Sequence, residues 1–231
     1  MNKSKSIELL ALLLVAILYS CTPPIVFDKA YPSGQENLVV IPESYRGAFI
    51  CESDSAVVVI TSKDITLHKT HYFNTKIKYA EQRADCQIVD DKMYLKGREE
   101  CISIMNVNDS IVQGIYNDID TLFVIQDQSH ARIYKGHLVL NQEMNTSEWT
   151  ISLLTPEQGG DLSLRAITRK TKIENVERIT QTFDITRAND KSPRYKVKPT
   201  IIEFDAMLAD NKIFIECEYL VRVQLEGLLL N

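Results

Sequence analysis

The sequence is poor in the glycine, cysteine and histidine patterns on which many enzymes depend. Only 8 of its 231 residues are glycine, and none stands in a phosphate-binding loop, a dinucleotide fingerprint or a Gly-x-Ser-x-Gly elbow. The usual signatures of nucleotide-dependent enzymes and of α/β-type serine hydrolases are therefore missing. No Cys-x-x-Cys pair is present, which removes the common motif of thioredoxin-like redox proteins and of structural zinc sites.

Histidine is also scarce, with 4 residues in the chain. His68 and His71 would share one face of a helix, but their segment alternates like a strand, in which residues three apart lie on opposite faces. The carboxylates Asp118 and Asp120 coincide with a predicted turn, where aspartate is common for backbone reasons. We therefore expect no catalytic residue, no metal site and no cofactor.

No long run of like charges occurs, and the net charge of −5 at pH 7 is moderately acidic. This balance argues against nucleic acid as a partner and against electrostatic attachment to a membrane surface. The hydrophobic fraction of 45% and the charged fraction of 25% are those of an ordinary globular chain.

The N-terminus has the pattern of an export signal. Two lysines form a short basic start, Leu9 to Leu18 are all apolar, and the small Ser20 precedes Cys21. About ten apolar residues make a helix of only ~15 Å, roughly half the hydrocarbon thickness of a bilayer, so a permanent transmembrane helix is not expected. We predict that residues 1–20 are a cleaved signal peptide.

The tetrapeptide Leu18-Tyr19-Ser20-Cys21 resembles the lipobox of bacterial lipoproteins, with Tyr19 in place of the usual small residue. The resemblance implies cleavage before Cys21 and attachment of lipid, such as palmitate, to that cysteine. It implies a Gram-negative cell-envelope protein whose membrane contact is this lipid. The residue after the cysteine is Thr22 and not aspartate. In such lipoproteins this favours sorting to the outer membrane, on its periplasmic face or at the cell surface.

The rest of the chain is expected to be mainly β. Residues 21–44 are dense in proline and predict a tether. Residues 45–168 predict an antiparallel meander, because short alternating or β-branched runs recur about every 9 to 10 positions with turn residues between them. So many strands predict a barrel, a sandwich or a rolled sheet. The run from Ala56 to Ile60 is apolar throughout and predicts a central strand covered on both faces.

Residues 169–231 carry the clearest helix and the clearest strand. Thr200 and Glu203 have the spacing of a capping box and predict a helix over 201–210. The predicted apolar face of that helix is Ile201, Phe204 and Leu208. The other predicted elements are a short helix over 172–181 and a final long strand over 213–223. We expect this part to pack on the meander, so that 45–231 form a single β-rich domain.

Four cysteines remain beside Cys21, namely Cys51, Cys86, Cys101 and Cys217. They allow two disulfides in three connectivities, or buried free thiols. Cys51 belongs to an early strand and Cys217 to the last one, so a sheet that closes on itself would bring them together. We predict a Cys51–Cys217 disulfide if any disulfide forms.

Three segments read Asp, hydroxyl residue, aliphatic, and they resemble the O-glycosylation sequon that some Gram-negative bacteria use on exported proteins. The resemblance implies Ser55, Ser110 and Thr121 as acceptors. Turn chemistry gives the alternative explanation, because aspartate and serine open hairpins and an aliphatic residue begins the next strand.

These features predict a lipid-anchored cell-envelope protein that is a non-enzymatic binding or structural module, with a protein or glycan as its partner. The alternative is a lipocalin-like carrier of a small apolar ligand, because a closed meander can enclose a cavity. A periplasmic hydrolase is the third and weakest hypothesis, since no catalytic constellation supports it.

Overall fold

The computed structural model describes residues 24–76, 86–89, 92–95, 101–108, 111–145, 147–180, 183–186 and 194–223. The protein is mainly β, as predicted, and its strands form a mixed sheet that is not closed into a barrel. The chain divides into two compact units. Among the described residues, the first unit holds 24–40 and 125–219, and the second holds 41–124 and 220–223. Each unit draws on both an early and a late part of the chain, and the single domain expected over 45–231 stays a prediction.

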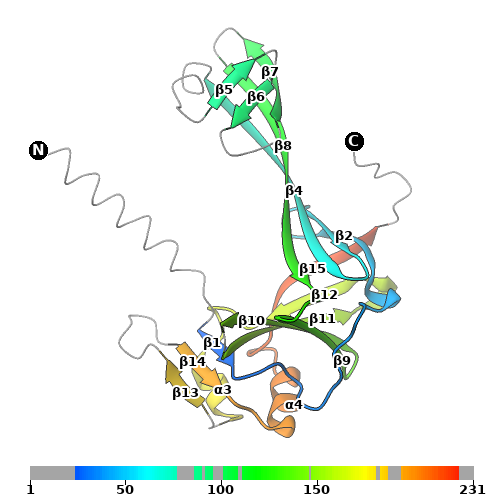
Figure 1. Cartoon of the computed structure of the whole chain (residues 1–231), viewed down its shortest axis with the longest axis vertical. Coiled ribbons are helices and arrows are strands. Elements are labelled where there is room, and N and C mark those ends of the chain that lie inside the picture. The colour runs from blue at the N-terminus through cyan, green and yellow to red at the C-terminus, as the bar shows by residue number, and fades with distance from the viewer. Residues whose placement is uncertain are drawn as a thin grey trace, which may run out of the picture. The chain divides into compact units, whose positions relative to one another are not determined.

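The first unit is built on eight strands. They are β1 (Ile25–Phe27), β9 (Ser129–Tyr134), β10 (His137–Asn145), β11 (Glu148–Pro156), β12 (Leu162–Ala166), β13 (Phe183–Thr186), β14 (Arg194–Val197) and the first part of β15 (Ile215–Val223). The order is β13–β14–β1–β11–β12–β15, with β10 on the other edge of β11 and β9 beyond it (Figure 1). β1 and β14 run parallel, which departs from the antiparallel meander that was expected. A parallel pair needs a long crossover, and here that crossover is most of the chain.

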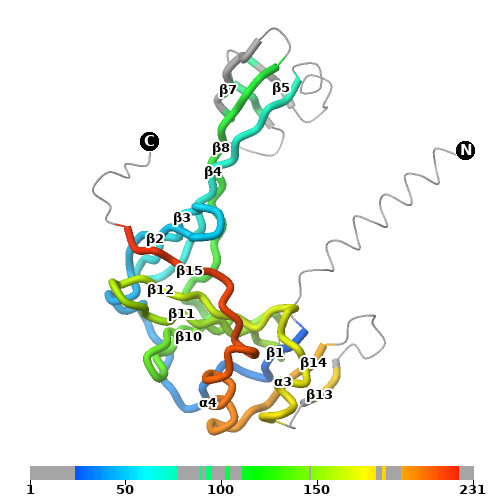
Figure 2. The backbone as a smooth tube through the Cα atoms, turned by 180° about the vertical axis from the view of Figure 1, so that it is seen from behind, coloured from blue at the N-terminus to red at the C-terminus, as the bar shows by residue number. Residues whose placement is uncertain are grey.

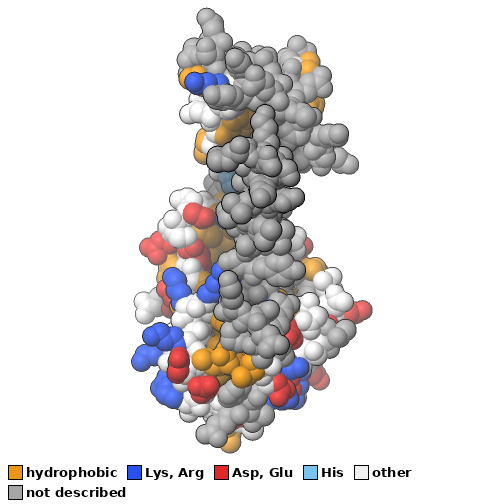
Figure 3. Space-filling view, turned by 90° about the vertical axis from the view of Figure 1, so that its left-hand side faces the viewer, with side chains coloured by type: hydrophobic (Ala, Val, Ile, Leu, Met, Phe, Trp, Pro, Cys, Tyr) orange, Lys and Arg blue, Asp and Glu red, His pale blue; other side chains and the backbone are white. Residues whose placement is uncertain are grey.

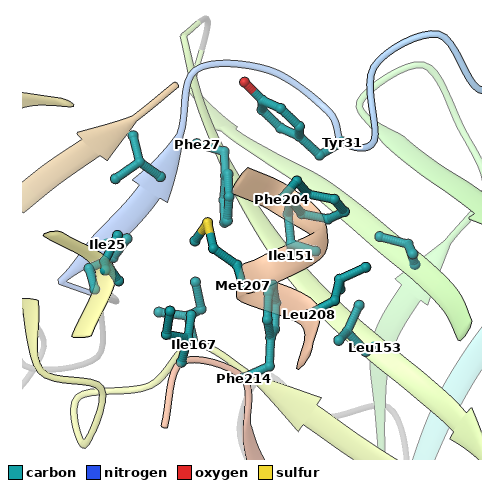
Figure 4. Packing of buried hydrophobic residues seen from close by; sticks show 14 residues of the cluster. Ile25, Phe27, Tyr31, Ile151, Leu153, Ile167, Phe204, Met207, Leu208 and Phe214 are labelled. Atoms are coloured by element: carbon teal, nitrogen blue, oxygen red, sulfur yellow. The ribbon is translucent and has the colours of Figure 1, made fainter. Parts of the chain in front are cut away.

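The core of the first unit lies where helix α4 (Ile201–Ala209) packs on this sheet (Figure 4). The Phe204 ring stacks on the Tyr31 ring with 5.3 Å between centroids and meets the Phe214 ring edge-on at 6.4 Å. The other fully or nearly fully buried members are Ile25, Phe27, Val139, Ile151, Leu153, Ile167, Val176, Val197, Met207, Leu208 and Ile213. The predicted packing of this helix on the β body is therefore confirmed.

The predicted capping box of α4 is also present. The Glu203 amide donates to the Thr200 Oγ1 at 3.3 Å, and the Glu203 Oε2 accepts from the Thr200 amide at 2.6 Å. The predicted apolar face is correct at Phe204 and Leu208 and wrong at Ile201, which is 42% exposed. Ile201 shares the face by angle but lies in the first turn, and Met207 is buried in its stead. The chain passes directly from α4 into β15 (Figure 2). The second helix, α3 (Ile173–Glu177), is shorter than predicted.

The N-terminal segment is not the tether that was expected for residues 21–44. Ile25, Val26 and Phe27 are at most 1% exposed, and Tyr31 is buried in the same core. The Tyr31 hydroxyl donates to the Asp28 Oδ1 at 2.9 Å, and burial raises the pKa of this phenol. The prolines around these positions suggested a linker, but the apolar residues between them bury enough surface to hold the segment in place.

The second unit is an antiparallel sheet with the order β15–β2–β3–β4–β8–β7–β6–β5. Its strands are β2 (Gly47–Cys51), β3 (Val57–Ile60), β4 (Asp64–Lys76), β5 (Cys86–Val89), β6 (Lys92–Leu95), β7 (Cys101–Asn108), β8 (Ile111–Val124) and the end of β15. A 3₁₀ turn, η2 (Glu43–Tyr45), precedes β2. This unit matches the predicted meander in type, because most sequential strands are neighbours.

β4 and β8 form a long two-stranded ribbon that the sequence did not predict (Figure 1). The sequence predicted a turn at Asp118 and Asp120, which would split β8 in two. In the structure the ribbon continues through this position, since Thr70 pairs with Asn117 and Lys69 pairs with Asp118. The Thr70 Oγ1 donates to the Asn117 Oδ1 at 2.9 Å, so each turn-forming residue finds a cross-strand partner instead.

A small apolar cluster joins the ribbon to β6 and β7. Its buried members are Met93, Ile102, Ile104 and Val112, and Phe73 and Tyr116 pack against it. Tyr116 also stacks on His71, with 4.7 Å between ring centroids. The cluster gives this end of the second unit a core of its own.

Candidate interaction surface

A row of five side chains crosses one face of the second unit. In strand order from β15 to β8, the row is Val221, Ile50, Val57, His68 and Ile119. Residues directly opposite one another in neighbouring strands point to the same side of a sheet, so these side chains lie side by side. Four of the five are aliphatic, and Ile119 is 60% exposed.

A second row runs beside the first on the same face. It consists of Val223, Ala48, Val59, Thr66 and Thr121. The Thr66 hydroxyl and the His68 Nε2 lie 3.0 Å apart, which links the two rows. Thr121 is exposed at the β8 end of the row, whereas Ala48 is buried among its larger neighbours.

The same face continues along the β4–β8 ribbon. Its further pairs are Thr70 with Asn117, Tyr72 with Ile115, and Asn74 with Gln113. Tyr72 is 71% exposed and Ile115 is 46% exposed, although both are large and apolar. We call the two rows and these three pairs, sixteen residues in all, the neutral face.

The neutral face has no charged residue at any of its positions. On β4 it is bounded by Asp64 at one end and Lys76 at the other. In a chain with 25% charged residues, sixteen positions on one face of a sheet without Lys, Arg, Asp or Glu are unexpected. Elsewhere the signs are mixed, and Figure 3 shows acidic and basic side chains interspersed on the side that it presents. Charge depletion together with exposed apolar residues distinguishes the centres of protein interfaces from ordinary surface.

The opposite face of the same strands holds their charges and is buried where β2, β3 and the start of β4 meet. Phe49, Val58 and Phe123 are at most 3% exposed there. The Arg222 guanidinium lies 4.6 Å from the centre of the Phe49 ring and donates to the Arg46 carbonyl at 2.7 Å. The neutral face therefore lies opposite a side of the sheet that is already buried around Phe49, Val58 and Phe123.

The sequence predicted a central strand at residues 56–60, covered on both faces. β3 does lie between β2 and β4, and its Val58 and Ile60 are buried. Val57 and Val59, on the neutral face, are only partly buried. The run of apolar residues therefore indicates this surface as well as the core, and the predicted burial of both faces is wrong for Val57 and Val59.

The structure separates the two cysteines that were predicted to pair. Cys51 is buried and Cys217 is exposed, and no disulfide joins them. β2 and β15 are neighbours, as the prediction required, but their register places Leu220 opposite Cys51. Cys217 precedes Leu220 by three residues, about 10 Å along an extended strand, whereas bridged Cα atoms lie within about 7 Å. The predicted Cys51–Cys217 disulfide is therefore absent.

The predicted modification sites differ in their setting. Cys21 and Ser110 lie outside the described residues, so lipidation of Cys21 stays a prediction. Ser55 is exposed in a turn with φ +60°, where the Asp54 Oδ1 accepts from the Ala56 amide. Turn chemistry explains that segment. It does not explain Thr121, which lies within β8 on the neutral face.

The histidines do not assemble into a site. His68 and His71 lie on opposite faces of β4, as predicted, with His71 stacked on Tyr116. His130 packs against Trp149, with 5.2 Å between ring centroids. The His137 Nδ1 lies 2.8 Å from the Thr155 Oγ1, and burial, with the nearby positive charge of Arg165, lowers the pKa of this imidazole.

The carboxylates Asp118 and Asp120 lie within β8 rather than in the predicted turn. In the part of the chain that the structure describes, no group of three or more His, Cys, Asp or Glu residues is arranged to hold a metal ion. No helix among the described residues is both long enough and apolar enough to cross a membrane.

Sequence reasoning therefore missed the neutral face, while the structure brings none of its predicted site residues together. The neutral face of β15, β2, β3, β4 and β8 is the candidate site, because it combines a lack of charge with exposed apolar side chains such as Ile119 and Tyr72. Comparison of the chain with protein-family models, curated proteins and solved structures finds no match in any of the three.

Proposed function

We propose that this protein is a lipid-anchored, non-enzymatic interaction module of the bacterial cell envelope, which contacts a protein partner through the neutral face. The lipobox-like sequence ending at Cys21 supports the anchor and a place at the outer membrane. The observation that carries the interaction is the uncharged row of aliphatic residues in the second unit, of which Ile119 and Val221 are exposed.

The size of the neutral face agrees with this function. One residue on one face of a sheet occupies about 30 Å², from a strand spacing of about 4.8 Å and a repeat of about 6.7 Å along the strand. Sixteen positions therefore cover about 500 Å². Nine of them are aliphatic or aromatic and cover about 300 Å², at the lower end of the range of the largest apolar patches on soluble proteins, which are often functional. A lipocalin-like carrier would need a closed sheet around its ligand. The strand order of the described residues is open, with β13 and β5 at its ends, and so does not support that alternative.

Photo-crosslinking in cells that make the protein tests the proposal. A photoreactive amino acid is placed at Ile119, and at Ile202 as the control, because Ile202 is an exposed isoleucine of α4 outside the neutral face. We expect a discrete adduct with a protein from position 119 and none from position 202. If position 119 yields no protein adduct, the neutral face is not an interaction surface and the proposal fails.

A further inference from the structure

We propose that the partner of the neutral face is a second copy of this chain, packed face to face about a two-fold axis. The inference rests on the proposed function, because it takes the neutral face to be the interaction surface. Two-fold contacts use the same patch on both subunits, so the patch must be complementary to itself. The neutral face meets that requirement in charge, in hydrogen bonding and in shape.

Charge is the first requirement. In a two-fold contact, a charged side chain beside the axis meets its own copy, which carries a like charge, and this costs free energy. The chain has a net charge of −5, but salt screens charges more than about 10 Å apart, so the charges at the contact itself matter most. None of the sixteen residues of the neutral face is Lys, Arg, Asp or Glu. On β4 the nearest charged residues of that face are Asp64 at one end and Lys76 at the other.

Hydrogen bonding is the second requirement. The polar positions of the neutral face are Thr66, Thr70, Thr121, Asn74, Asn117, Gln113 and His68. Hydroxyl, amide and neutral imidazole groups each carry both a donor and an acceptor. Such a group can pair with an identical group on the other copy, whereas carboxylate, ammonium and guanidinium groups cannot.

Shape is the third requirement. The two rows are made mostly of valine, isoleucine, alanine and threonine, the small and β-branched side chains that fill the space between two stacked sheets. A second sheet of the same composition fits at the usual spacing of about 10 Å. A lipid surface fits less well, because membrane-surface faces are rich in Lys and Arg, and this face has neither.

The area sets the expected strength. A contact of about 500 Å² per copy is smaller than the roughly 800 Å² of a standard stable interface. We therefore expect a reversible dimer that dissociates on dilution through the micromolar range, rather than an obligate one.

Sedimentation equilibrium of the processed protein tests this inference, with the protein extracted in a density-matched non-ionic detergent. The wild type is expected to rise from the protomer mass toward twice that mass with increasing concentration. The Ile119→Lys variant is expected to raise the dissociation constant at least tenfold, and Tyr72→Lys provides a second variant on the same face. Both side chains are exposed, so the fold tolerates the changes. Ile202→Lys is the matched control and is expected to behave as the wild type.

A wild type that stays at the protomer mass over the whole range overturns the dimer, as does an Ile119→Lys protein that associates like the wild type. The photo-crosslink at position 119 separates this failure from that of the proposed function. An adduct of twice the chain mass that contains only this chain supports the dimer. An adduct with a different protein overturns the dimer and leaves the proposed function standing.

Discussion

Gly114 lies directly opposite Phe73 in the β4–β8 ribbon, and the Phe73 ring occupies the space that a Cβ at position 114 would need. The ring packs against the cluster of Met93, Ile102, Ile104 and Val112. The glycine therefore allows an aromatic side chain to cross over the neighbouring strand and reach the apolar end of the second unit.

We expect Gly114→Ala to destabilise the protein by about 1–3 kcal/mol, because overpacking forces the ring or the backbone to move. Chemical denaturation followed by circular dichroism measures the change in the free energy of unfolding. The Phe73→Leu background is the control, since a smaller side chain leaves room for the methyl group. An equal cost of Gly114→Ala in both backgrounds would show that the ring does not occupy that space.

The aromatic centre of the first unit gives a second prediction. Phe204 is fully buried between Tyr31 and Phe214, so Phe204→Ala should cost about 3–5 kcal/mol through lost contacts and the cavity that remains. Thr200→Ala should cost about 1 kcal/mol through loss of the helix cap. Ile202→Ala, at a 77% exposed position of the same helix, is the control and should change stability by less than about 0.5 kcal/mol. A Phe204→Ala protein as stable as this control would refute the assignment of α4 to the core.

The buried ion pair of the first unit, between Arg194 and Glu148, gives a third prediction. Arg194 donates to Glu148 at 2.5 Å, and Asn145 donates to the same carboxylate oxygen at 2.8 Å. Both charged side chains are less than a tenth exposed. Glu148→Gln should cost about 3–5 kcal/mol, because the guanidinium remains buried without its counter-charge. The double variant Glu148→Leu/Arg194→Met should recover most of the lost stability. Thermal melts of the wild type, Glu148→Gln and the double variant measure the difference.

His137 gives a prediction for pH. Its folded-state pKa is lowered below the ordinary value of 6.5, first by burial and then by Arg165. The unfolded chain therefore binds the proton more readily, so stability rises with pH in this range. The contribution is complete above about pH 6.5 and is lost as pH falls through the folded-state value. Denaturant melts between pH 5 and 8 should show a smaller pH dependence for His137→Gln than for the wild type, and an unchanged slope would contradict the assignment.

The anchor gives the last prediction. Mass spectrometry of the N-terminal peptide of the mature protein should find lipid on Cys21 after cleavage behind Ser20. Cys21→Ala should leave the protein out of the membrane fraction. A Cys21→Ala protein that still fractionates with membranes would exclude the lipid as its anchor.

Local patterns were the part of this fold that the sequence predicted well. The Thr200 and Glu203 capping box and the alternation of the final strand depend on residues a few positions apart, so their structure could be deduced from the sequence alone. The ribbon could not be deduced, because Asn117 and Asp118 favour turns when considered locally. Their partners Thr70 and Lys69 lie nearly fifty residues earlier, and only the fold makes them neighbours.

The candidate surface was missed for a different reason. A run such as Val57 to Ile60 indicates that both faces of a strand are apolar, but it does not indicate whether each face is covered by other residues. Phe49 and Phe123 lie on the covered side, while Ile119 and Val221 are exposed on the other. The distinction depends on register across five strands, which periodicity within one strand does not contain.

The parallel pairing of β1 with β14 places a constraint on the order of folding. Ile25 of β1 pairs with Tyr195 of β14, so the first described strand cannot take its place in the sheet until one of the last strands is present. A chain that is made or exported from its N-terminus carries Ile25, Val26 and Phe27 without their final partners until α4 has also emerged. Strands β2 to β8 are available much earlier, and their contacts are more local. The second unit can therefore complete most of its sheet while the first is still open, and the early apolar strand needs protection from aggregation during that interval.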